Sequence, residues 1–275
     1  MFTTAVAFDQ NSGSLLTASY DAKVTRWNEA TGESAWLTGA GHTNSVQALA
    51  VQGDRLISGG MDDSIHFSSL GSFSYSGAKI ATDGPVNSVA ASQADDLVVA
   101  TTIKSIYVVR GTAVASNTPV SYGPRAVALS PDNSTVAVGG DDRKLHVYTL
   151  AGSALRESAT HDFNGDVENV AFSPNGDLIG VADRERFIKV FKRDSFEQTY
   201  QSRVHTARIH GIAFSPDSSR LATVSQDARL VIHPLNGGAR EEINTHRMGA
   251  NNLVWIDNAT IATVGQDCAV RSWNV

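Results

Sequence analysis

An acidic residue recurs about every 41 positions along this 275-residue chain, each time between a run of small apolar residues and a short alternating segment. Ile103 fills the one gap in a series otherwise formed by Asp21, Asp62, Asp142, Glu185, Asp227 and Asp267. The successive steps are 41, 41, 39, 43, 42 and 40 residues. A repeat of this length that contains only strand-like segments is typical of a β-propeller. We therefore predict an all-β fold over residues 1–275: a single seven-bladed propeller with four antiparallel strands per blade.

Each repeat has the same order of expected strands. In the first repeat, short apolar strands at 5–8 and 15–19 precede Asp21, and an alternating strand follows at 24–27. A more polar and more variable strand comes last, for example at 73–80. Apolar inner strands and polar outer strands suit blades arranged around a crowded channel. Because only two residues follow Trp273, either the last blade lacks its outer strand or a flanking segment supplies it.

Composition and charge exclude several functional classes. The net charge is −6 and no basic stripe is visible, so we expect no nucleic-acid partner. There is no apolar run of 18 residues and no signal-peptide pattern, so we expect neither a membrane partner nor secretion. The single cysteine, Cys268, cannot form an internal disulfide, which favours a reducing compartment. Together these features predict a cytoplasmic protein.

Three repeats combine a histidine, a hydroxyl and a carboxylate, a set that also occurs in catalytic triads. The sets are His42, Ser58 and Asp62; His205, Thr223 and Asp227; and His246, Thr263 and Asp267, the last with Trp273. The first repeat has Thr17, Asp21 and Trp27 without a histidine. Because a nucleophile motif should occur once, whereas this set repeats with the blade period, we predict structural hydrogen bonds and no enzyme activity.

Metal and cofactor sites are not expected from the sequence. The eight histidines include no pair with the close spacing on one face that a zinc site needs. No glycine-rich phosphate-binding loop is present. We therefore predict no catalytic, metal or cofactor-binding residues.

The sequence resembles the WD40 family. Gly41-His42 opens a repeat, and Asp21 with Trp27 and Asp267 with Trp273 match the family's Asp-to-Trp spacing. The resemblance covers nearly the whole chain, although Ile103, Val138 and Val181 replace polar members in repeats three to five. We expect those three blades to be held by packing alone.

A narrower resemblance connects the chain to the actin-interacting protein 1 family. Residues 41–46, 56–65, 136–142 and 270–273 are similar to the C-terminal propeller of that family. The resemblance implies two seven-bladed propellers, and partners that are actin and cofilin. It also implies a cytoskeleton-associated protein that promotes cofilin-assisted disassembly of actin filaments. Because this chain is long enough for one propeller, we expect it to be one half of such a protein.

Family geometry places the acidic turns and the histidine loops at one end of the ring. The charged neighbours expected to form a partner-binding face there are Asp63, Asp141, Arg143, Lys144, Arg184, Arg186, Arg208 and Arg229. A second possibility is a general WD40 adaptor or scaffold subunit of another protein complex.

Overall fold

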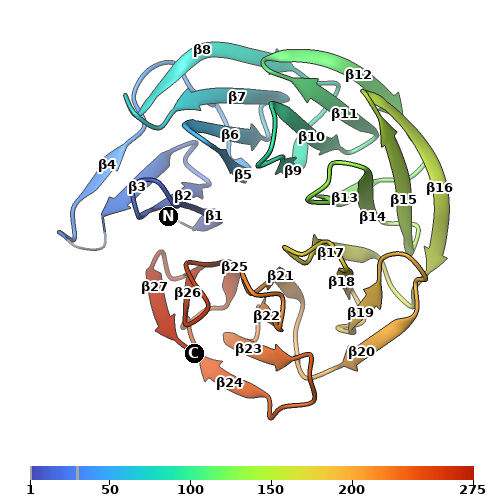
Figure 1. Cartoon of the computed structure of the whole chain (residues 1–275). Coiled ribbons are helices and arrows are strands. Elements are labelled where there is room, and N and C mark those ends of the chain that lie inside the picture. Colours follow the sequence, from blue (N-terminus) through green and yellow to red (C-terminus); the bar gives the residue numbers. More distant parts are fainter. Residues whose placement is uncertain (1, 29–30) are drawn as a thin grey trace.

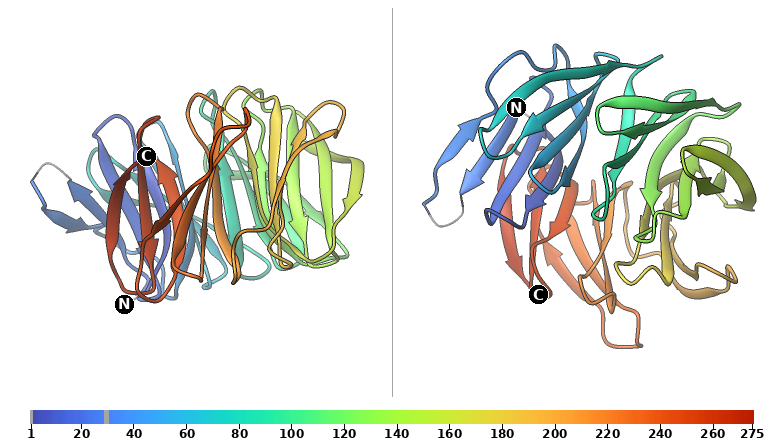
Figure 2. Two further views of the ribbon diagram at one scale, coloured as in Figure 1. Left: turned by 90° about the horizontal axis from the view of Figure 1, so that it is seen from below. Right: turned by 45° about the horizontal axis from the view of Figure 1, so that its top comes forward.

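The computed structural model describes residues 2–28 and 31–275, and within them it contains 27 strands and no helix. The strands form seven antiparallel sheets, or blades, arranged in a ring (Figure 1). Seen from the side, the ring is a short cylinder whose blades stand next to one another (Figure 2). The predicted all-β, seven-bladed propeller is therefore confirmed.

The first four blades each contain four strands in chain order. Blade 1 comprises β1 (Thr3–Asp9), β2 (Ser14–Ser19), β3 (Val24–Asn28) and β4 (Ser34–Trp36). Blade 2 comprises β5 (Val46–Gln52), β6 (Arg55–Gly60), β7 (Ser64–Ser69) and β8 (Ser74–Ala81). Blade 3 comprises β9 (Val86–Ala91), β10 (Leu97–Thr102), β11 (Ser105–Arg110) and β12 (Ala113–Pro119). Blade 4 comprises β13 (Pro124–Leu129), β14 (Thr135–Gly140), β15 (Lys144–Ala151) and β16 (Ala154–Asp162).

The last three blades differ in strand number. Blade 5 comprises β17 (Val167–Phe172), β18 (Leu178–Asp183), β19 (Ile188–Lys192) and β20 (Gln198–Ser202). Blade 6 comprises β21 (Ile209–Phe214), β22 (Arg220–Ser225), β23 (Arg229–Pro234) and β24 (Glu241–Asn244). Blade 7 comprises β25 (Ala250–Trp255), β26 (Thr260–Gly265) and β27 (Val270–Asn274). Among the described residues, β27 is thus the outer edge of a three-stranded sheet.

The core lies between neighbouring blades. The second strands are almost entirely buried because both of their faces are covered by adjacent blades. All six residues of β10 are buried, for example, whereas most residues of the outer strand β12 are exposed. Between blades 2 and 3, Ile57, Ile65 and Phe67 pack with Val86 and Val98. Each blade is therefore stabilised mainly by its two neighbours.

The innermost strand of every blade has a β-bulge at the same place. Its register with the second strand shifts near the start of the strand in all seven blades. The bulged residue is polar each time: Thr4, Gln47, Asn87, Arg125, Glu168, His210 and Asn251. A bulge leaves one residue without a strand partner and redirects its side chain. All seven residues line a cavity of about 500 Å³ at the centre of the ring.

The ring closes by packing of blade 1 against blade 7 (Figure 1). The Thr3 hydroxyl donates to the Gly265 carbonyl at 3.0 Å, and Asn251 Nδ2 donates to the Thr3 carbonyl at 2.6 Å. Val6 and Leu15 contact Val264 in a shared apolar cluster. In the part of the chain that the structure describes, no helix has the length and apolar character needed to span a membrane.

Candidate functional site

The acidic turns and the histidine-bearing loops lie together at one end of the ring, which we call the polar end. In blade 2, His42 comes from the loop before β5 and Asp62 from the turn between β6 and β7. His42 Nδ1 lies 2.8 Å from Asp62 Oδ1, and Nε2 lies 2.8 Å from the Ser58 hydroxyl. Burial would raise the pKa of Asp62, but hydrogen bonds from His42, Thr43 and Ser64 outweigh this effect and lower it.

Blade 6 repeats this hydrogen-bonded set. His205 Nδ1 is 3.0 Å from Asp227 Oδ2, and Nε2 is 2.8 Å from the Thr223 hydroxyl. His233 occupies the place of the tryptophan in the last repeat, and its Nε2 lies 3.0 Å from the same hydroxyl. The His205 side chain is completely buried, and hydrogen bonds from His205 and Thr206 hold the pKa of Asp227 low against the opposing effect of burial.

Blade 7 contains the set together with its tryptophan. His246 Nδ1 is 2.7 Å from Asp267 Oδ1, and Nε2 is 2.9 Å from the Thr263 hydroxyl. Trp273 Nε1 donates to the same hydroxyl at 2.8 Å. Burial would raise the pKa of Asp267, but hydrogen bonds led by that from His246 lower it to about 2. An ionised carboxylate can only accept, so Nδ1 carries the imidazole proton and the threonine hydroxyl donates to Nε2.

Blade 1 keeps part of the pattern. Trp27 Nε1 donates to the Thr17 hydroxyl at 2.8 Å. The Asp21 carboxylate accepts from the Ser19 hydroxyl and from the Lys23 backbone N–H. Asp21 therefore joins the two ends of its own turn.

The expectation that blades 3 to 5 are held by packing alone is wrong. In blade 3 the carboxylate comes from the loop before β9, where Asp83 accepts from the hydroxyls of Ser105 at 2.6 Å and Thr102 at 2.8 Å. The backbone N–H of Asp83 donates to the Tyr107 hydroxyl at 3.0 Å. In this blade the loop supplies the carboxylate, and the residues beside the turn supply the hydroxyls. The hydrogen bonds between loop and turn therefore form although Ile103 replaces the acidic residue of the turn.

Blade 4 uses aromatic rings for the same connection. Tyr122 lies in the loop before β13 and stacks on His146, with the ring centroids 3.7 Å apart. The hydroxyls of Tyr122 and Tyr148 are 2.8 Å apart. His146 also contacts Asp142 at 3.2 Å and Glu157 at 2.6 Å.

In blade 5, Asp183 is buried and accepts from the Phe187 backbone N–H at 3.0 Å. Burial raises the pKa of this carboxyl.

The eight charged residues of the predicted partner face all lie in or beside turns and loops of the polar end. Asp63, Asp141, Arg143, Arg184 and Arg208 are exposed, whereas Lys144, Arg186 and Arg229 are half-buried. Three of the arginines form ion pairs within the chain, and Arg186 donates to the Thr206 carbonyl at 3.0 Å. Arg184 pairs with Asp166 at 3.1 Å, Arg208 pairs with Glu168 at 2.7 Å, and Arg229 pairs with both Asp227 and Glu242.

Exposed apolar side chains lie at the same end and are not among the residues predicted from the sequence. Six large apolar residues among those described are exposed there, in blades 7, 1, 2 and 3: Met248, Phe2, Tyr20, Trp36, Met61 and Ile103. Their position in the repeat could have identified three of them, because Tyr20 and Met61 directly precede an acidic turn position and Ile103 occupies one. The arginines and Lys144 lie in blades 4, 5 and 6. The exposed apolar side chains and the basic residues of the predicted face therefore lie on different blades of the polar end.

The comparisons with known proteins agree with this architecture. The WD domain, G-beta repeat family matches residues 115–149 and 196–233. The chain is a propeller that contains WD40 repeats. It is 35% identical over 276 residues to the 66 kDa stress protein of Physarum polycephalum and 30% identical over 277 residues to Actin-interacting protein 1 of Drosophila melanogaster. It is also 31% identical over 268 residues to WD repeat-containing protein 1-A of Xenopus laevis.

These matches cover 99%, 99% and 95% of the propeller but 46%, 46% and 44% of the three relatives. The chain therefore spans about half the length of the curated relatives that it matches. The predicted resemblance to WD40 repeats and to actin-interacting protein 1 is confirmed.

Proposed function

We propose that this propeller is a non-catalytic, actin-regulatory binding module that assists cofilin-driven disassembly of actin filaments. The observation that carries the proposal is the match over 99% of the chain to Actin-interacting protein 1 of both Drosophila melanogaster and Caenorhabditis elegans. In this proposal the propeller is one half of a two-propeller cytoplasmic protein, because those relatives are about twice as long. Its partners are actin and cofilin, with no role for nucleic acid or membranes.

The buried hydroxyls support a binding role over catalysis. Ser58, Thr223 and Thr263 are completely buried, so a substrate cannot reach the oxygen that would act as the nucleophile. Both ring nitrogens of each associated histidine are already hydrogen-bonded within the blade. The sets therefore act as structural connections between loop, strand and turn.

The polar end is the proposed partner face. Interfaces commonly combine apolar contacts with charges that select and orient the partner. Tyr20, Met61 and Ile103 supply exposed apolar surface there, and Arg143 and Arg186 supply positive charge. This combination suits a partner with an apolar surface bordered by acidic groups.

The test is filament disassembly by the full-length protein that contains this propeller. Actin filaments are incubated with the protein, with and without cofilin, and the actin left in the supernatant after sedimentation is measured. We expect a cofilin-dependent increase. Reversing two charges, Arg143→Glu with Arg186→Glu, should reduce that increase at least about tenfold, because the like charges now repel the acidic partner. Arg156→Glu is the control, since Arg156 is exposed on the outer strand β16, away from the polar end.

Two results would contradict the proposal. Filaments that remain unchanged in the presence of cofilin would favour a general WD40 adaptor or scaffold subunit of another complex. An Arg156→Glu effect equal to that of the double reversal would remove the polar end as the contact face.

A further inference from the structure

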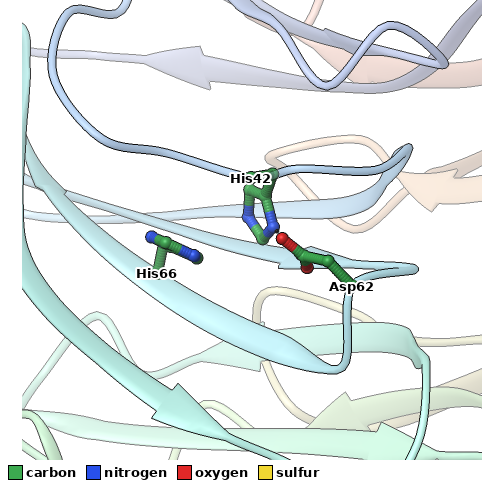
Figure 3. A group of neighbouring side chains, drawn as sticks. All are labelled: His42, Asp62 and His66. Carbon is green, nitrogen blue, oxygen red and sulfur yellow. Dashed lines mark hydrogen bonds and ion pairs between the residues drawn. The ribbon is translucent and has the colours of Figure 1, made fainter.

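Blade 2 brings together two histidines that are 24 positions apart in the sequence. His42 lies in the loop before β5, Asp62 lies in the turn after β6, and His66 lies on β7 (Figure 3). One ligand atom from each residue lies within 4.8 Å of the other two. The two imidazole centroids are 4.3 Å apart, and the Asp62 carboxylate faces His42 (Figure 3). We propose that these three side chains form a site for one divalent transition-metal ion, with Zn²⁺ as the best chemical match.

The donor set suits that ion. Zn²⁺ is commonly bound by imidazole nitrogen and carboxylate oxygen, with a fourth position left for water or another ligand. His66 is buried beside the imidazole of His42 and the carboxylate of Asp62, so the three donors converge within the blade.

The surrounding groups hold the ligands in place. Metal-binding histidines usually donate their second ring nitrogen to a protein acceptor. The Ser58 hydroxyl is 2.8 Å from Nε2 of His42 and can take that role. When the ion replaces the hydrogen on Nδ1, the imidazole proton moves to Nε2 and the ring stays neutral. The Thr43 backbone N–H fixes the second carboxylate oxygen of Asp62 at 2.9 Å. The Tyr75 ring packs edge-on against His66 and helps to exclude water.

The sister blades show what blade 2 lacks. The carboxylates of blades 6 and 7 each pair with an arginine: Asp227 with Arg229 at 2.9 Å and Asp267 with Arg271 at 2.8 Å. Among the described residues, Asp62 has no arginine or lysine within ion-pair distance. The counterparts of Asp62 in blades 6 and 7 are each paired with a guanidinium, whereas Asp62 is not paired with a cationic side chain of the described residues.

The strand register makes the comparison direct. Position 66 on β7 lies opposite Ser58, just as Arg271 on β27 lies opposite Thr263. In blade 7 this strand position sends a guanidinium to the His–Asp pair. In blade 2 the same position holds a histidine, which can supply a metal ligand but not a permanent positive charge. In blade 2 the proposed metal cation therefore lies beside the His42–Asp62 pair, where blade 7 has the guanidinium of Arg271.

Calorimetric titration of the metal-free chain with ZnCl₂ tests the site, with Co²⁺ absorption as a spectroscopic probe. We expect one Zn²⁺ per chain, a higher melting temperature with Zn²⁺, and the visible bands of tetrahedrally bound Co²⁺. His66→Val should weaken Zn²⁺ binding at least about tenfold and abolish the bands, since it removes one ligand. Blade 6 has Val231 at the aligned position, so valine fits a strand of this kind. His161→Gln is the control, since His161 lies in blade 4, outside the cluster.

Two results would overturn the assignment. One is the absence of stoichiometric Zn²⁺ binding to the wild-type chain. The other is equal binding by a His66→Val variant whose metal-free melting curve shows a single cooperative transition. If that variant does not fold, His66→Gln serves in its place, because glutamine keeps a polar side chain but removes the imidazole.

Discussion

A single imidazole with both nitrogens bonded connects three parts of a blade. His205 joins the loop before β21 to the Asp227 turn and, through Thr223, to the middle of β22. The side chains of His205 and Thr223 are buried, so water cannot replace a lost partner. Removing one partner of a buried polar group leaves the others with an unpaid desolvation cost, and this cost exceeds the net value of an ordinary hydrogen bond.

His205→Ala should therefore lower the free energy of unfolding by about 1–3 kcal/mol without abolishing the fold. Urea denaturation followed by circular dichroism measures the change. His161→Ala is the comparison, because His161 is half-buried and stacks on Phe196. Equal losses for the two variants would argue against a special contribution from the His–Asp set.

The residue types at the polar end could be predicted only where they recur in fixed roles. His42 and Asp62 repeat in the same order and at nearly the same spacing as His246 and Asp267, so their proximity follows from the period. Asp83 could not be predicted because its carboxylate occupies the loop position and its hydroxyl partners, Thr102 and Ser105, lie at the strand ends on either side of the turn. The contact between His42 and His66 was also missed. It depends on the strand register and the loop path, neither of which a spacing rule based on a single element can represent.

At the scale of the element, alternation predicted the strands but could not predict the bulges. A bulge inserts one residue into the pairing without changing the apolar character of the strand. His210 shows the consequence, since it lies between the buried Ile209 and the glycine at 211, yet lines the central cavity. The polar residues that line the central cavity therefore could not be predicted from the alternation of apolar and polar residues.

The third strand of blade 7 differs from its counterparts. In blades 2, 3 and 6 the third strand is largely buried, because a fourth strand covers its outer edge. None of the five residues of β27 is fully buried. Part of its backbone has no strand partner among the described residues, and such edges open more easily than paired interior strands.

Hydrogen exchange should reveal this difference. Peptides that cover β27 (Val270–Asn274) should exchange at least about tenfold faster than peptides that cover β23 (Arg229–Pro234), which has partners on both sides. Mass spectrometry of deuterium uptake near neutral pH measures both segments in the same sample. Equal protection of the two segments would show that another part of the protein or a second copy covers the β27 edge.

The whole ring keeps several imidazoles neutral, which couples its stability to pH. Burial is the main cause of a lowered pKa at His66, His161, His210, His233 and His246. The pKa falls to about 4 at His66 and His210 and to about 3 at His233. Electrostatic interactions with Lys79 beside His66, with Arg208 beside His210 and with Arg240 beside His233 lower the pKa further, as do those with the neighbouring His42 and His205. Asp62 beside His66 acts in the opposite direction.

These shifts predict a loss of stability between about pH 6.5 and pH 4, before most carboxylates titrate. In that window the unfolded chain binds protons at its histidines while the folded ring does not, so the free energy of unfolding falls as the pH falls. Each such histidine contributes at most about 1.4 kcal/mol per pH unit. Urea midpoints at pH 7, 6 and 5 measure the slope, which His66→Val should reduce by removing one group. A midpoint independent of pH would mean that the folded ring binds protons at these imidazoles as readily as the unfolded chain does. An unchanged slope in His66→Val would mean the same for His66 alone.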